Sequence, residues 1–98
     1  MNGGGKLPDI VCIGEVMVEF NAVNRGPLMS VELFEKNAAG AEGNVAIGTS
    51  RLGCSSGMIS RVGGDEFGLF LMATLKGENV DTSRISVDND FPTAIFFI

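Results

Sequence analysis

Apolar runs and alternating stretches in the N-terminal part of the chain predict strands. Residues 9–14 (D-I-V-C-I-G) form a short continuous apolar run that ends in glycine, a pattern typical of a central parallel strand buried on both faces. Residues 15–23 and 30–37 each alternate between apolar and polar positions, which predicts half-exposed strands. The turn residues at 24–27 (N-R-G-P) separate them. We therefore expect a small antiparallel ribbon beside the main sheet.

The middle of the chain predicts a helix over residues 41–52. Gly53 follows it as the glycine that ends many helices. Helical spacing predicts one stripe of this helix facing the core, and small residues elsewhere on it suit a close approach to a sheet. The predicted stripe is Val45, Gly48, Thr49 and Leu52.

The remaining pattern continues the alternation of strand and helix. Residues 56–62 predict a strand, and residues 65–77 predict a second helix with an acid at its start and a lysine near its end. Residues 80–83 are expected to form a connector, residues 85–87 a short strand and residues 93–98 a last strand. The core positions expected on the second helix are Phe67, Phe70, Leu71 and Leu75.

This order of elements predicts an α/β fold. Strands that alternate with helices favour βαβ units, and therefore a mostly parallel sheet flanked by helices. The chain has 98 residues, enough for one small domain. Its last residues, 94–98, form an apolar run that calls for burial. We expect residues 1–8 to be a disordered tail and residues 9–98 to be the N-terminal part of a longer domain.

Charge and composition exclude several classes of function. The net charge is −5 and the seven basic residues are scattered, which argues against nucleic acid and anionic membranes as partners. No apolar run approaches the roughly 20 residues that span a bilayer. Histidine is absent, so Ser-His and Cys-His nucleophilic pairs cannot form here. Cys12 and Cys54 are too few for a disulfide framework, and we expect a cytoplasmic protein.

The start of the first predicted helix is the strongest candidate for a binding site. Backbone N–H groups at a helix start are unpaired, and glycines there let a ligand approach them. Asn44 can donate and accept hydrogen bonds, and Glu42 can accept one from a hydroxyl. The same residues are also compatible with a turn glycine, an acid that complements the helix dipole and a solvated asparagine. The candidate residues are Gly40, Ala41, Glu42, Gly43 and Asn44.

These motifs resemble the PfkB, or ribokinase-like, family of carbohydrate kinases over residues 9–98. The glycine-led helix start is similar to the family's sugar site, and G-A-E-x-N looks like its 2-keto-3-deoxygluconate kinase branch. The segments G-E-V-M-V-E-F-N and N-R-G-P-L look like the same branch. The later R-L-G, R-V-G-x-D-x-x-G and V-D segments keep the family's order. The resemblance implies a ribokinase-like fold in which residues 15–37 and 93–98 form a β lid.

The resemblance also implies two sugar contacts from the lid. Glu19 lies at the position, a few residues past Gly14, where the family more often has an aspartate that reaches the sugar. Phe96, in T-A-I-F, takes the place of the tyrosine in the branch's T-G-I-Y segment and would close over the substrate. A solvated role for Glu19 and a core role for Phe96 remain as alternatives.

For a complete enzyme, the resemblance implies transfer of the γ-phosphoryl group of ATP, with Mg²⁺, to a primary hydroxyl. The first substrate to expect is 2-keto-3-deoxygluconate; the alternatives are a fructokinase- or ribokinase-type kinase and a noncatalytic sugar-binding module. The family's catalytic aspartate is expected beyond residue 98, so no catalytic, ATP-binding or metal-binding residue is assigned here. Family members often pair lid strands between subunits, which implies a homo-oligomer.

One further motif points elsewhere. Residues 63–67 spell G-G-D-E-F, the signature of diguanylate cyclases, in which it lies on a β-hairpin and its acids hold a metal over a nucleotide. Here the following residues predict a helix, with Asp65 as its N-terminal cap. Neither G-x-G-x-x-G after the first strand nor a Walker-type phosphate loop is present in the sequence.

Overall fold

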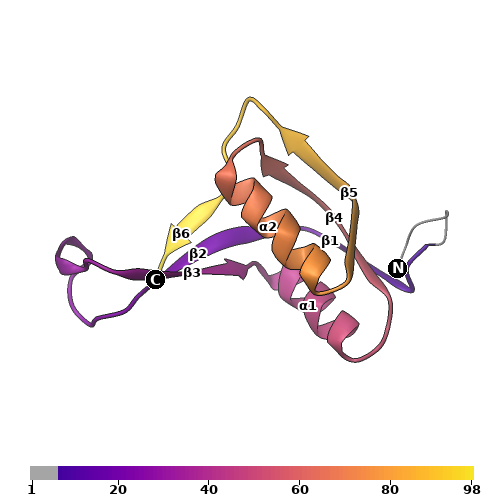
Figure 1. The fold of residues 1–98 in the computed structure, drawn as a ribbon, viewed down its shortest axis with the longest axis horizontal. Helices are drawn as coiled ribbons and strands as arrows, with labels where there is room; N and C mark the ends of the chain where they lie inside the picture. Colours follow the sequence, from indigo (N-terminus) through magenta and orange to yellow (C-terminus); the bar gives the residue numbers. More distant parts are fainter. Residues whose placement is uncertain (1–6) are drawn as a thin grey trace.

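The computed structural model describes residues 7–98, which form two helices and two three-stranded sheets (Figure 1). The expected tail, residues 1–8, lies almost wholly outside this range; Leu7 is exposed and Pro8 is buried. Neither helix in the described range is long and apolar enough to cross a membrane. The elements are β1 (Ile10–Ile13), β2 (Met17–Ala22), the 3-10 turn η1 (Leu28–Ser30), β3 (Phe34–Ala39), α1 (Ala41–Arg51), β4 (Ser56–Gly63), α2 (Glu66–Gly77), β5 (Val80–Asp88) and β6 (Ile95–Phe97).

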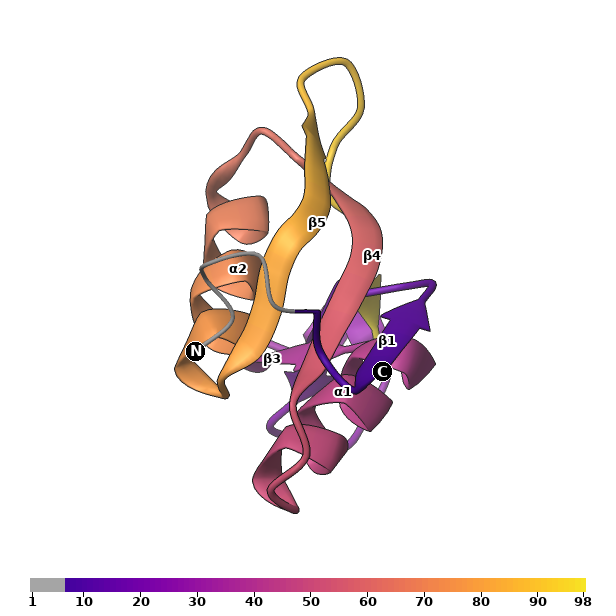
Figure 2. The same cartoon turned by 90° about the vertical axis from the view of Figure 1, so that its right-hand side faces the viewer.

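The main sheet is parallel, in the order β1-β4-β5, as the sequence predicts (Figure 2). Helix α1 packs on β1 and β4, and α2 packs on β4 and β5. The core between them is apolar, and Met58, Leu71 and Leu75 are fully buried in it. Burial of apolar surface between helices and sheet is therefore the main source of stability in this layer.

The apolar run of β1 predicts a central strand buried on both faces, and residues 7–98 provide a neighbouring strand on one side only. Strand β1 lies at an edge of the described sheet, while β4 pairs on both sides. Only Cys12 packs against the core; Val11 is exposed and Ile13 is 72% exposed. The reason is that, among residues 7–98, both helices pack on the same face of the sheet. Val11, Ile13 and Ile59 consequently form an exposed apolar stripe on the other face.

Helix α1 ends one residue before its predicted end, and it faces the core with different residues. Val45 and Leu52, which the apolar stripe predicts as buried, are 55% and 87% exposed. Gly43 and Ala46 are buried instead, since their small size brings the helix backbone against the strands. The carbonyl of Ala46 accepts a hydrogen bond from Ser56 Oγ at 2.7 Å. Gly53 follows the helix with a φ of 97°, as predicted for a terminal glycine.

Two strands differ from their predicted bounds by more than two residues. Strand β3 begins at Phe34 rather than at residue 30, because η1 occupies residues 28–30. Strand β5 is continuous from Val80 to Asp88, where a connector and a short strand were expected. Its pairing with β4 shifts register between Gly57 and Ile59. Because of the shift, the buried position after Thr82 is Ile85, three residues later and not two. This interrupts the alternation of buried and exposed positions from which a strand is predicted.

The second sheet, hereafter the lid sheet, has the order β3-β2-β6. The pairing of β2 with β3 is antiparallel, as predicted, whereas β6 joins β2 in parallel. One face of this sheet carries an aromatic cluster of Phe20, Phe34 and Phe97 that meets Phe67 of α2, with Phe20 and Phe67 ring centroids 5.6 Å apart. These aromatic contacts fix the lid sheet against α2.

The junction between β3 and α1 is packed backbone to backbone. Gly40, the residue before α1, has a φ of 106°, which favours glycine. A Cβ at position 40 would lie 2.5 Å from the carbonyl oxygen of Glu15. That same oxygen accepts the N–H of Gly43 at 3.3 Å. The start of α1 is thus held against the turn between β1 and β2.

Replacing Leu71 by alanine should destabilise the protein by about 2–5 kcal/mol, because a fully buried side chain is removed from the core. The matched control is Leu69→Ala on the same helix, where the side chain is 65% exposed and the change should cost less than about 0.5 kcal/mol. Urea unfolding followed by circular dichroism measures both. Equal losses for the two variants would contradict the packing described here.

Replacing Gly40 by alanine should cost more stability than replacing Gly53 by alanine. Both glycines have positive φ, so both changes carry backbone strain of about 1–2 kcal/mol. Position 53 has open space around it, whereas a Cβ at position 40 meets the Glu15 carbonyl, which adds about 1–3 kcal/mol. The difference between the two unfolding free energies isolates that contact. No difference would show that the junction tolerates a side chain.

Candidate functional site

The face of the lid sheet opposite the aromatic cluster carries a row of three residues from three strands. Glu19 of β2 lies directly opposite Asn37 of β3 and directly opposite Phe96 of β6. Residues paired in this way project to the same face of a sheet. Glu19 and Phe96 are partly buried and Asn37 is exposed. The row therefore combines a carboxylate, an amide and an aromatic ring on one surface.

Phe96 does not pack in the hydrophobic core, the alternative to a place over the substrate. Its neighbour Phe97 pairs with Phe20 and stacks on it, with ring centroids 5.2 Å apart. Because successive residues of a strand point to opposite faces, Phe96 projects away from the aromatic cluster. Its ring lies on the same face as Glu19.

The start of α1 adjoins this row. The next pair along the two strands on this face is Met17 and Ala39, and Gly40 follows Ala39 directly. Asn44, one turn into the helix, is exposed, and its N–H donates to the Gly40 carbonyl at 2.9 Å. We call residues Gly40–Asn44 the helix entrance. The fold brings the helix entrance and the lid row next to each other, from segments far apart in the sequence.

Glu42 has a structural contact that neither interpretation of the sequence includes. Its Oε1 accepts the backbone N–H of Glu15 at 2.9 Å. The carboxylate lies so close to Gly14 that a side chain there would collide with it. Glu42 therefore holds the turn after β1 against the helix entrance, and one of its two carboxylate oxygens is engaged in doing so.

Asn37 was missed in the sequence because β3 was placed four residues too early. The predicted strand ended at Asn37, which left the residue at a strand terminus rather than opposite Glu19. Its signal in the sequence is weak: a polar residue directly before the A-A-G that leads into the helix entrance. Only the register of the β2–β3 pair assigns it to the row.

The G-G-D-E-F segment runs from the last residue of β4 through a short turn into the first residues of α2, and does not form a β-hairpin. Asp65 caps α2, as predicted, by accepting the N–H of Gly68 at 2.8 Å. It also accepts the hydroxyl of Thr93 at 2.6 Å and the N–H of Thr93 at 2.9 Å. Hydrogen bonds from Thr93, and then from Gly68, lower the pKa of this carboxyl, so it is charged at neutral pH.

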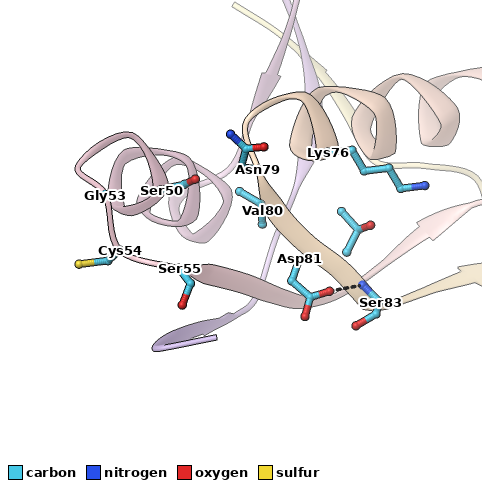
Figure 3. A pocket seen from close by; sticks show the side chains of 10 residues that line it. Ser50, Gly53, Cys54, Ser55, Lys76, Asn79, Val80, Asp81 and Ser83 are labelled. Atoms are coloured by element: carbon cyan, nitrogen blue, oxygen red, sulfur yellow. Dashed lines mark hydrogen bonds between the residues drawn. The ribbon is translucent and has the colours of Figure 1, made fainter. Parts of the chain in front are cut away.

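A groove of about 650 Å³ lies at the other end of the main sheet (Figure 3). Its lining includes Ser55 and Val80, beside the amino ends of β4 and β5. Asp81 in this groove accepts the N–H of Ser83 at 2.9 Å. In open α/β sheets, ligands bind beyond the carboxyl ends of the strands. The helix entrance, which contacts the turn after β1, lies at that end and is the better candidate.

Residues 7–98 contain no cluster of three or more His, Cys, Asp or Glu side chains arranged to hold a metal ion. The polar groups gathered at the helix entrance and the lid row are hydrogen-bonding groups: backbone amides, one amide side chain from each segment and a carboxylate. Such a set suits a neutral or weakly charged polyhydroxylated ligand.

The chain is similar to known proteins over most of its length. The chain is 43% identical over 99 residues to the 2-dehydro-3-deoxygluconokinase of Thermoproteus tenax, covering 96% of this chain and 30% of that protein. It is 42% identical over 90 residues to the probable fructokinase-7 of Arabidopsis thaliana, covering 91% of this chain and 26% of that protein. The chain thus spans about 30% of the length of such relatives.

Solved structures share the fold. A sugar kinase from Pyrococcus horikoshii, crystallised in complex with ATP, superposes with a TM-score of 0.87 at 48% sequence identity, covering 90% of this chain and 29% of that one. The sequence profile of the pfkB family carbohydrate kinases matches residues 7–98. The chain belongs to the pfkB family of carbohydrate kinases, as its motifs predict.

Proposed function

We propose that this chain forms the sugar-binding part of an ATP-dependent sugar or sugar-acid kinase. The observation that carries the proposal is the meeting of the helix entrance with the row of Glu19, Asn37 and Phe96 on one face of the lid sheet. Together the two segments offer hydrogen-bond donors, acceptors and an aromatic ring, which are the groups that recognise a sugar.

Each residue of the site has a proposed role. The backbone amides of Gly40 and Ala41, at positions without a bulky side chain, let the sugar approach the start of α1, and Asn44 pairs with its hydroxyls. Gly43 supports the site from behind, because it is buried and its N–H donates to the Glu15 carbonyl. Glu19 accepts hydrogen bonds from hydroxyls. Phe96 covers the apolar face of the sugar.

Glu42 acts mainly through position. Because its Oε1 accepts the N–H of Glu15, it fixes the turn that borders the pocket. Asn37, opposite Glu19, adds a second amide to the lid row.

In the reaction, the γ-phosphoryl group of ATP passes to a primary hydroxyl of the bound sugar. The residues of this chain bind and orient the sugar, and the lid sheet keeps water out, since water would otherwise accept the phosphoryl group. We assign the general base and the sites for ATP and Mg²⁺ to the part of the kinase that follows the matched segment in longer family members. We place the enzyme in the cytoplasm, which fits the free thiols of Cys12 and Cys54.

The preferred substrate is 2-keto-3-deoxygluconate. The motif G-A-E-G-N at residues 40–44 and the similarity to the Thermoproteus tenax enzyme support this choice. Phosphorylation of fructose is the second candidate, because a probable fructokinase matches at 42% identity. Sugar binding without turnover is the third, since the matched segment includes none of the groups that would transfer the phosphoryl.

An ATP-coupled assay on the full-length gene product tests this function with 2-keto-3-deoxygluconate, gluconate, fructose and ribose. We expect phosphorylation of 2-keto-3-deoxygluconate at the lowest sugar concentration. Asn44→Ala should raise the KM for the sugar about tenfold by removing a hydrogen-bonding side chain. Asn24→Ala, in an exposed turn of the lid, is the matched control and should leave the KM unchanged.

Two outcomes would contradict the proposal. If the enzyme prefers fructose, the choice of 2-keto-3-deoxygluconate is wrong and fructose becomes the substrate. Binding of a sugar in calorimetry without any ATP-dependent product would establish the noncatalytic alternative.

We also propose that the complete protein is a homo-oligomer built through its lid sheets. Among the described residues, β3 pairs on one side only, which leaves a strand edge able to pair with another chain. Sedimentation equilibrium of the full-length gene product should give a dimer or a larger assembly. A strict monomer across the concentration range would remove this proposal.

A further inference from the structure

We propose that Asp65 and Thr93 form a latch that fixes lid strand β6, and with it Phe96, beside the sugar site, so that Asp65 is a positioning residue for sugar binding. The inference rests on the proposed function, because it assigns Phe96 to the sugar pocket. It gives a role to Asp65 of the G-G-D-E-F segment, which lies outside the proposed sugar site.

The latch is a closed set of hydrogen bonds between three segments. Asp65 receives two bonds from Thr93, one from its hydroxyl at 2.6 Å and one from its N–H at 2.9 Å. The Thr93 hydroxyl oxygen in turn accepts the N–H of Gly63, at the end of β4, at 2.9 Å. The end of β4, the start of α2 and the residue leading into β6 are thereby tied together.

Close packing holds the latch in one arrangement. Thr93 is 5% exposed. A side chain at position 63 would collide with the N–H of Thr93 and with the Asp65 carboxylate. A Cβ at position 68 would meet the Gly63 carbonyl and would lie 3.1 Å from Thr93 Oγ1. Glycine at both positions is therefore what allows the three segments to approach closely.

The latch can control the position of β6 because few other contacts hold the start of this strand. Strand β6 is three residues long, and β2 is the strand it pairs with. The residues that lead from β5 to Thr93, 89–92, are exposed. Immediately after Thr93, the carbonyl of Ala94 accepts the N–H of Val18 at 3.0 Å, which starts the pairing that sets Phe96 opposite Glu19. Releasing Thr93 should loosen the whole of this short strand.

The chemistry of the carboxylate allows the latch to be tested apart from the helix cap. Asparagine caps helices about as well as aspartate, so Asp65→Asn can keep the bond from Gly68. Its amide NH₂ group is a donor, however, and would then face the N–H of Thr93, which is also a donor. Thr93→Val removes the hydroxyl from the other partner, and Thr93→Ser keeps it as the matched control.

The experiment compares these three variants with the wild-type full-length gene product. Initial rates are measured against the sugar that the wild type phosphorylates and, separately, against ATP. We expect Asp65→Asn and Thr93→Val to raise the KM for the sugar about tenfold while the KM for ATP stays within about twofold. Thr93→Ser should behave as the wild type. A sugar KM within about twofold of wild type in both disrupting variants would overturn the latch.

Hydrogen exchange supplies a readout that needs no activity. The amides that pair strand β6 with β2, among them the Ile98 N–H on the Phe20 carbonyl, should exchange about tenfold faster in Asp65→Asn, while those of α2 keep their protection. Unchanged exchange in β6, or equal acceleration in β6 and α2, would overturn the latch. A wild-type protein that phosphorylates no sugar would instead refute the proposed function, and the exchange result would still decide whether the latch exists.

Discussion

The structure depends on a contact between two pieces of backbone: the carbonyl of Glu15, in the turn after β1, and the start of α1. That oxygen accepts the N–H of Gly43 and leaves no room for a side chain at position 40. The N–H of the same residue donates to Glu42. Glu15 is thus bound through both its backbone groups, and the helix entrance is held where the lid sheet meets the parallel sheet. The candidate site depends on glycine at position 40, because only glycine lets the two backbone segments approach this closely.

Much of the fold could be predicted from the sequence, since local patterns determine it. Both helices have close to their predicted bounds, and Asp65 and Gly53 take the terminal roles that their residue types favour. Predictions failed where partners far away in the chain decide the outcome. The buried face of α1 follows from small residues fitting against Val16, and not from its largest apolar side chains. The irregular pairing in β5 gave its first half the pattern of a connector and only its second half that of a strand.

The candidate site divides in the same way. The helix entrance has a motif, and Glu19 and Phe96 occupy positions that a family resemblance can assign. Asn37 has neither, because it depends on the register between β2 and β3. The partner of Glu42 was unpredictable for a related reason: it is a backbone group 27 residues away. A hydrogen bond to a backbone group so far away has no local pattern, so the sequence left Glu42 between a ligand contact and the helix dipole.

The apolar stripe of Val11, Ile13 and Ile59 bears on how this polypeptide can be handled. These side chains lie on the side of the sheet that neither helix shields, next to the edge of β1 that no strand among residues 7–98 pairs with. An exposed apolar surface beside backbone groups without a partner promotes association between chains. Overexpressed by itself, the 98-residue polypeptide is a candidate for inclusion bodies and for capture by chaperones. Solubilising fusions and dilute refolding are the sensible routes to a usable sample.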